Sequence, residues 1–310
     1  MSKAAQGPRA ELVWMDGEMV AWDDAKIHVM SHVIHYGSGA FEGARVYEHP
    51  KGPAMLRMKE HVRRLVESSK MLRMELKWSE DEIREAIRET VKVNKLKSCY
   101  VRPMAYRGVG PAGVNPLRNP VHLFIAVWEW GKYLGEEALT EGVDVCVSNY
   151  RRMAPDTHLP MGKIAGNYVN SQFAKMEAVL GGFVEAILLD HAGNLSEGSG
   201  ENLFLVRDGK LYTPGFGSSI LGGITRHSVV QLAKEAGIEV IEQSLPREFL
   251  YVADEAFFCG TAAEITPIRS VDRMQVGKGG RGPMTEQLQK SFFDVIEGRA
   301  DDRFEWLEFI

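Results

Sequence analysis

The sequence is poor in cysteine and has no long apolar run. Its three cysteines, Cys99, Cys146 and Cys259, lie far apart, are odd in number and show no zinc-ligand spacing. They fit a reducing compartment, and we expect each to be a small core residue and not a reactive thiol. No stretch approaches the roughly 18 consecutive apolar residues that span a bilayer. Residues 1–8 have no apolar run behind them, so no secretory signal is expected. The sequence therefore predicts a soluble cytoplasmic protein.

Clusters of basic residues are also missing. The chain carries 37 Lys and Arg against 42 Asp and Glu, a formal net charge of -5, and no basic block stands out. This argues against nucleic acid or an anionic membrane as a partner. The length of 310 residues suggests two domains or one large one and is ample for a sizeable core, and the hydrophobic content of 45% is ordinary for a globular protein.

Hydrophobic periodicity and turn residues predict helices and strands in both halves of the chain. Asp16-Gly17 and Asp208-Gly209 are hairpin signals, and Ser79 with Glu82 forms a capping box. The predicted strands lie within residues 11–22 and at 99–105, 122–128, 143–148, 185–190, 202–207, 238–241 and 255–259. The predicted helices lie at 60–73, from 79 onward, at 167–180, from 222 to Gly237, and at 284–297.

This pattern predicts a mixed α+β fold with two domains. We expect a small N-terminal α/β domain over residues 1–128, a linker over 129–140 and a larger C-terminal domain over 141–310. A loop dense in Gly and Pro at residues 107–116 could be a passive connector or could carry binding function.

Lys163 lies in a short segment of small and apolar residues, Leu159–Tyr168. A lysine so placed is partly desolvated, which favours the neutral amine, and a neutral amine can form a Schiff base with a carbonyl. The same residue could equally be an ordinary surface lysine at the start of a helix.

Three further stretches offer the groups that a phosphorylated cofactor needs. Gly222–Thr225 places glycines and a hydroxyl at a helix start, where amides favour a phosphate, although a plain helix cap would look the same. Gly260–Ala263 follows a strand with another hydroxyl, or is only a tight turn. Leu195–Asn202 holds two acids, Glu197 and Glu201, either of which could pair with a protonated ring nitrogen or lie in a surface turn. Together with Lys163, these stretches offer a Schiff-base amine, phosphate donors and a partner for a ring nitrogen, which are the groups that pyridoxal phosphate needs.

Histidines at 28, 32 and 35 could suggest a metal on a helix. No carboxylate or cysteine completes a ligand set, so we expect no metal.

The sequence resembles the branched-chain amino acid aminotransferases, which belong to the class IV pyridoxal-phosphate aminotransferases. Eight motifs carry the resemblance in order, from about Trp14 to the C-terminus. They are His35-Tyr36-Gly37, Phe41–Arg45, Glu60–Leu65, Tyr100–Pro103, Gly162–Tyr168, Ser196–Phe204, Gly223–Arg226 and Gly260–Glu264. The resemblance implies the two-domain fold type IV, in which the larger C-terminal domain has a β-barrel-like core.

The resemblance also implies roles for particular residues. Lys163 would form the covalent aldimine with pyridoxal 5'-phosphate and move the proton between the substrate carbon and the cofactor. Glu197 would pair with the pyridine nitrogen and Tyr168 with the phenolic oxygen. The phosphate would be held by Arg64, Ile224, Thr225 and Thr261. The substrate α-carboxylate would lie near Tyr100 and the Thr261-Ala262 turn. The substrate pocket would be lined by Tyr36, Phe41, Arg45, Arg102, Trp130 and Tyr133, some of them across a dimer interface.

The reaction implied is transfer of the amino group of L-leucine, L-isoleucine or L-valine to 2-oxoglutarate, giving branched-chain 2-oxo acids and L-glutamate. It would proceed by a ping-pong mechanism in branched-chain amino acid biosynthesis. Aromatic walls would bury the aliphatic group, while Arg102 would reach the carboxylate of glutamate. The alternatives on the same fold are a transaminase for D-amino acids or (R)-amines, and aminodeoxychorismate lyase. The family implies a homo-oligomer, a dimer at minimum, with hexamers among its higher assemblies.

Overall fold

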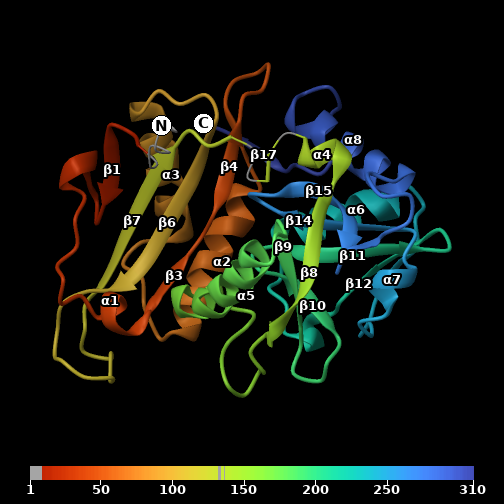
Figure 1. Cartoon of the computed structure of the whole chain (residues 1–310). Coiled ribbons are helices and arrows are strands. Elements are labelled where there is room, and N and C mark those ends of the chain that lie inside the picture. The colour runs from red at the N-terminus through yellow and green to blue at the C-terminus, as the bar shows by residue number, and fades with distance from the viewer. Residues whose placement is uncertain (1–8, 132–133, 136) are drawn as a thin grey trace, which may run out of the picture. The chain divides into compact units, whose positions relative to one another are not determined.

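The computed structural model describes residues 9–131, 134–135 and 137–310, and its contacts group into two compact units (Figure 1). The first unit takes in the chain up to Gly131 together with Gly162–Gly166 and Ile296–Ile310. The second takes in the remainder, up to Met161 and from Asn167 to Val295. The predicted domain limits stay a prediction, because residues 132, 133 and 136 of the expected linker lie outside the described residues.

An antiparallel sheet forms the centre of the first unit, with the order β17-β5-β4-β6-β7-β1-β2 and with β3 beside β6. Its strands are β1 Leu12–Met15, β2 Glu18–Ala21, β3 Gly39–Phe41, β4 Ala44–Tyr47, β5 Ala54–Leu56, β6 Cys99–Arg107, β7 Val121–Trp128 and β17 Leu307–Phe309. The helices of this unit are α1 His32–Tyr36, α2 Met58–Met71 and α3 Glu80–Val93. Leu65 of α2 and Ile83 and Ile87 of α3 share one buried apolar cluster with Val101 and Ile125 of the sheet. Burial of these side chains fixes the two helices on the sheet.

The local signals in this unit are confirmed. Asp16 and Gly17 have φ of 51° and 106° and join β1 to β2, and Ser79 and Glu82 form a reciprocal capping box at the start of α3. Residues 122–128 form a nearly continuous apolar run, which is typical of a strand buried on both faces. In β7, however, only alternate residues, Leu123, Ile125 and Val127, are buried, because the strand lies in an antiparallel sheet with helices on one face.

The second unit is built on a larger, mixed sheet that curls into a half-barrel. The strand order is β10-β9-β8-β15-β14-β11-β12-β13, with β16 beside β15. The strands are β8 Val143–Arg151, β9 Glu185–Leu189, β10 Leu195–Gly198, β11 Asn202–Arg207, β12 Lys210–Thr213, β13 Val240–Glu242, β14 Glu255–Gly260, β15 Glu264–Val271 and β16 Met274–Gln275. The helices are α4 Ala138–Glu141, α5 Tyr168–Leu180, α6 Ile224–Glu235, α7 Phe249–Val252 and α8 Pro283–Ile296. The predicted α+β class is thus confirmed.

Turn signals of the second unit are confirmed as well. Asp208 and Gly209 have φ of 49° and 73° and join β11 to β12, and Gly237 follows the end of α6 with φ of 73°. All three cysteines are buried and unpaired, as expected of core residues. Within the described part of the chain, no helix is long and apolar enough to cross a bilayer.

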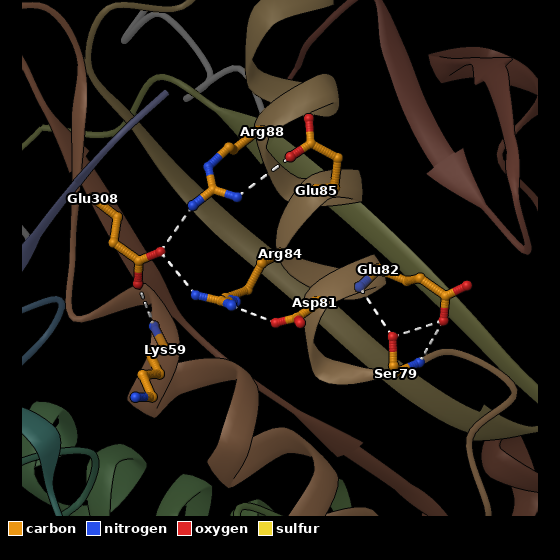
Figure 2. Close-up of polar contacts among 8 residues, drawn as sticks. All are labelled: Lys59, Ser79, Asp81, Glu82, Arg84, Glu85, Arg88 and Glu308. Atoms are coloured by element: carbon orange, nitrogen blue, oxygen red, sulfur yellow. Dashed lines mark hydrogen bonds and ion pairs between the residues drawn. The ribbon is translucent and has the colours of Figure 1, made fainter.

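The expectation that a helix closes the chain is wrong, since β17 follows α8 and pairs with β5. Glu308 of β17 lies at the centre of a polar cluster (Figure 2). Its carboxylate accepts from the Lys59 amide at 2.9 Å, from Arg88 at 2.8 Å and from Arg84 at 3.3 Å. Helix α2 has no side-chain cap of its own at Arg57, which lies in the left-handed region, so Glu308 satisfies an amide of its first turn. The C-terminal strand thereby ties α2 to α3.

Glu308→Gln should lower the free energy of unfolding by about 1–2 kcal/mol, because it weakens two charge-assisted hydrogen bonds and a helix cap. Urea unfolding followed by circular dichroism would measure this. The matched control is Glu85→Gln, which removes an exposed partner of Arg88 and should cost less than about 0.5 kcal/mol. Equal losses in the two variants would show that Glu308 is only another surface acid.

Candidate active site

Lys163 is held in the first unit by its own backbone. Its amide donates to Ser68 Oγ of α2 at 3.0 Å, and its carbonyl accepts from the Phe41 amide of β3 at 3.0 Å. The side chain is half-buried, and its Nζ lies 4.9 Å from the centre of the Phe41 ring. The backbone of Lys163 is therefore fixed between a helix and a strand, and its side chain is not fully exposed.

Arg64, the expected phosphate ligand, is oriented by Glu42. The Arg64 guanidinium donates from Nε to Glu42 Oε1 at 2.6 Å and from Nη2 to Oε2 at 2.9 Å, and His61 Nδ1 lies 2.6 Å from Oε2. Glu42 is fully buried. His61, Arg64 and Ser68 share one face of α2, at positions i, i+3 and i+7. One helix face thus carries both the arginine and the hydroxyl that holds Lys163.

The charges of this cluster follow from its burial. Burial alone would raise the pKa of Glu42, but the Arg64 guanidinium and His61 outweigh it and hold that pKa far below its usual range. Burial lowers the pKa of His61, and the Glu42 carboxylate opposes this only in part. His61 is therefore neutral and donates its Nδ1–H to a charged Glu42. The result is a single ion pair with a neutral third member.

Arg102 of β6 lies in an aromatic cage, which we define as Phe41, Tyr100 and Trp128. Its guanidinium carbon is 4.9, 5.3 and 5.7 Å from the three ring centres. Its Nη2 is 3.4 Å from the Tyr100 hydroxyl, and its buried Nε has no hydrogen-bond partner within the described residues. Cation–π contacts replace part of its hydration. The cage thus holds a cation that retains capacity to bind an anion.

The expected pocket residues Arg45 and Trp130 lie behind this cage. Arg45 is buried and donates to the carbonyls of Trp130 and Gly131 at 3.2 and 2.9 Å. Trp130 packs edge-on against Tyr100, with ring centres 4.7 Å apart. A Cβ at position 43 would lie 1.7 Å from the Tyr100 hydroxyl, so only glycine admits this ring. Arg45 therefore positions the wall of the pocket.

Two other expected pocket residues are not brought into the cage. Tyr36 ends α1, is 51% exposed and packs on His32 with ring centres 4.5 Å apart. Tyr133 lies outside the described residues.

In the second unit, Glu197 lies in β10 and is held by three donors. Its Oε1 is 2.7 Å from Arg152 Nη2, and its Oε2 accepts from Asn202 Nδ2 and from the Leu221 amide, each at 3.0 Å. Both Glu197 and Arg152 are buried. The reading of Glu197 as a surface turn acid is therefore excluded.

Glu201 differs from Glu197 in its partners. It is equally buried, and burial, followed by the nearby Glu185, raises the pKa of Glu201 well above its usual range. The two acids of the motif are therefore distinct, and Glu197 is the one that pairs with a buried arginine.

The other expected contacts of the second unit converge near Glu197. Asn202, which begins β11, pairs with Cys259 near the end of β14, and Thr261 and Ala262 lie in the turn that follows. The same Asn202 side chain donates to the Leu221 carbonyl at 2.9 Å, three residues before α6 begins at Ile224. Ile224 and Thr225 are buried in the first turn of that helix, whose cap Gly223 makes no side-chain hydrogen bond. Tyr168 begins α5 and is half-buried.

Several residues that build these sites have no predicted role. Glu42 lies in the motif Phe41–Arg45 and Asn202 in the motif Ser196–Phe204, and their polar side chains among apolar and glycine neighbours were a signal in the sequence. Trp128 is hidden in an apolar strand pattern, and Arg152 follows another arginine in a polar stretch, so neither gave a signal.

Comparison with known proteins identifies the class. The family model of class IV amino-transferases matches residues 39–271. The chain belongs to this family. It is 50% identical over 301 residues to the branched-chain-amino-acid aminotransferase of Escherichia coli K12, covering 97% of each chain. That relationship places it among the branched-chain-amino-acid aminotransferases.

Solved structures agree with this placement. The crystal structure of the Escherichia coli branched-chain amino acid aminotransferase matches with a TM-score of 0.95, 50% identity, and coverage of 97% of this chain and 99% of that one. The T.th. branched-chain amino acid aminotransferase, crystallised with N-(5'-phosphopyridoxyl)-L-glutamate, matches with a TM-score of 0.93, 46% identity and the same coverage. The same protein was also solved with pyridoxamine 5'-phosphate (TM-score 0.94, 47% identity, same coverage) and with 4-methylvaleric acid (TM-score 0.93, 44% identity, same coverage).

Proposed function

We propose that this protein transfers the amino group of L-leucine, L-isoleucine or L-valine to 2-oxoglutarate, with pyridoxal 5'-phosphate as cofactor and by a ping-pong mechanism. The ligands of the T.th. relative support the cofactor and two kinds of substrate side chain. Pyridoxamine 5'-phosphate is an amino form of the cofactor, the phosphopyridoxyl adduct carries glutamate, and 4-methylvaleric acid has the carbon skeleton of leucine.

The residues of the chain fit this cofactor chemically. When bound, the cofactor supplies an electron sink for bond breaking at the substrate α-carbon. Gly223 leaves the first-turn amides of α6 without a side-chain cap, which suits a phosphate. We assign the phosphate contacts to Arg64, Ile224, Thr225 and Thr261, the ring-nitrogen contact to Glu197 and the phenolic-oxygen contact to Tyr168. Lys163 Nζ would bind the cofactor and carry the proton to and from the substrate carbon.

One observation carries the substrate assignment. Arg102 is a half-buried cation whose buried Nε has no partner within the described residues and whose faces are covered by Phe41, Tyr100 and Trp128. The rings offer apolar contact to a branched side chain, and the guanidinium offers an ion pair to the side-chain carboxylate of glutamate or 2-oxoglutarate. We place the substrate α-carboxylate near Tyr100 and the Thr261-Ala262 turn.

A donor panel tests the proposal as a whole. The purified protein should show a visible absorption band that shifts with L-leucine or L-valine and should use 2-oxoglutarate with parallel-line kinetics. D-alanine and (R)-1-phenylethylamine should be poor amino donors, and pyruvate should be a poor acceptor. Lys163→Ala should lose the band and nearly all turnover, because no other amine would bind the cofactor at this point.

Preference for D-alanine or the (R)-amine would favour another transaminase of this fold, and release of pyruvate from aminodeoxychorismate would favour a lyase. A Lys163→Ala variant that kept both band and rate would overturn the assignment of Lys163. Lys278→Ala, which removes an exposed lysine of the second unit, should behave as wild type.

Arg102→Ala should raise the KM for 2-oxoglutarate about 100-fold, while the KM for L-leucine changes less than about fivefold, because only the first substrate offers it a side-chain carboxylate. Steady-state assays of the two substrates would measure the split. Arg273→Ala is the matched control, since Arg273 lies over the Phe183 ring at 4.9 Å on the surface. Equal losses for both substrates would contradict the assigned role of Arg102.

We also propose that the protein is a homo-oligomer, at minimum a dimer. Val169, Phe173, Met176 and Leu180 form one apolar stripe on α5 and are 51, 44, 50 and 89% exposed. Such a stripe is typical of a surface that another protein covers. The exposure of Tyr36, expected in the pocket, fits a role that needs a second copy. The three buried, unpaired cysteines support the cytoplasm as the location.

Phe173→Asp should weaken self-association at least tenfold, because it places a charge in the stripe. Sedimentation velocity over a range of protein concentrations would measure it. Gln172→Asp adds the same charge at an exposed polar position of the same helix and should leave the assembly intact. A wild-type protein that sediments as a monomer would contradict the proposal.

A further inference from the structure

Arg152 is a buried arginine that follows β8. Its Nη2 lies 2.7 Å from Glu197 Oε1, its Nε donates to the Ser219 carbonyl at 3.4 Å, and its backbone amide donates to the Leu189 carbonyl at 2.8 Å. Only 7% of its surface is exposed, against 5% for Glu197. The side chain therefore joins Glu197 to the segment that leads into α6.

A buried ion pair is costly to form, because both charges leave water, and apolar residues of similar volume often serve stability better. The pair Arg152–Glu197 is therefore poorly explained by stability alone. Glu197 also accepts from Asn202 and from the Leu221 amide, which are both neutral donors and both bind Oε2. Arg152 is the cation in this set, and it binds the other oxygen.

We propose that Arg152 is a positioning residue of the cofactor site, which keeps Glu197 charged and oriented for the ring nitrogen of pyridoxal phosphate. This inference rests on the proposed function, in which Glu197 contacts that nitrogen. A charged carboxylate favours the protonated ring nitrogen, and the protonated ring is the stronger electron sink. Arg152 itself does not touch the cofactor in this scheme.

Glu201 is the other buried acid of this motif, and among the described residues it forms no ion pair with an arginine. It lies four residues further along, and burial, followed by the nearby Glu185, raises the pKa of Glu201 well above its usual range. The two acids thus differ in their charged neighbours, since the guanidinium of Arg152 lies beside Glu197.

The test measures the affinity of the apo-protein for pyridoxal 5'-phosphate and for 1-deazapyridoxal 5'-phosphate, in which a C–H group replaces the ring nitrogen. Arg152→Gln should weaken binding of the first about tenfold or more, as outer partners of metal-binding side chains do. It should leave the second almost unchanged, because that analogue cannot pair with Glu197. In single-turnover reactions with L-leucine the rate should fall more than the apparent affinity for L-leucine, and Arg152→Lys should restore part of both losses.

Arg269→Gln is the matched control, because Arg269 pairs through two hydrogen bonds with Asp144 of the same strand β8 but lies at the surface. It should bind both cofactors as wild type does. A purely structural role for Arg152 would weaken both cofactors equally in Arg152→Gln, and that result would overturn the inference. If Arg152→Gln does not fold, Arg152→Lys carries the same comparison.

Glu197→Gln separates the inference from the proposed function. If Glu197→Gln weakens binding of pyridoxal phosphate selectively and Arg152→Gln does not, Arg152 has no such role, while the assignment of Glu197 stands. If neither variant discriminates between the two cofactors, the assignment of Glu197 fails and the inference fails with it. If the losses in the double variant Arg152→Gln/Glu197→Gln are not additive, the two residues act together.

Discussion

Taking a charged side chain out of water costs several kcal/mol unless an opposite charge and hydrogen bonds replace the solvent, and this constraint shapes one buried ion pair in each of the two units. In the first unit, Arg64 is held by the fully buried Glu42. In the second, Glu197 is held by the buried Arg152. Arg64 and Glu197, two of the proposed cofactor contacts, are therefore each oriented by an ion pair within their own unit.

Helix α2, which carries Arg64, is itself held by hydrogen bonds from distant parts of the chain. Glu308, only two residues from the C-terminus, satisfies the Lys59 amide at the start of α2 and holds two arginines of α3. Further along α2, Ser68 receives the amide of Lys163. The end of the chain, the proposed phosphate ligand and the proposed Schiff-base lysine are thus connected through one helix.

Local features of the fold could be predicted because their causes are local. The hairpins at Asp16-Gly17 and Asp208-Gly209 need only residues that tolerate positive φ, and the capping box needs only Ser79 and Glu82. The strand β17 was missed because its three residues are too short for a period and depend on β5 for pairing. Lys163, Glu197 and Arg64 stood in motifs, but their partners Ser68, Arg152 and Glu42 come from distant segments. Nothing in a single sequence says which distant arginine meets which acid.

In the proposed function, the arrangement of Arg102 would allow one pocket to bind two chemically opposite side chains. A solvated cation would repel a leucine side chain through its hydration shell, whereas a guanidinium with aromatic rings on its faces has given up part of that shell already. An aliphatic group can then contact Phe41 and the other rings with little further loss of water. A carboxylate meets an in-plane N–H that has no other partner within the described residues. The guanidinium loses this water when the protein folds. The free-energy cost of dehydration is therefore already included in folding and is the same for both proposed substrates.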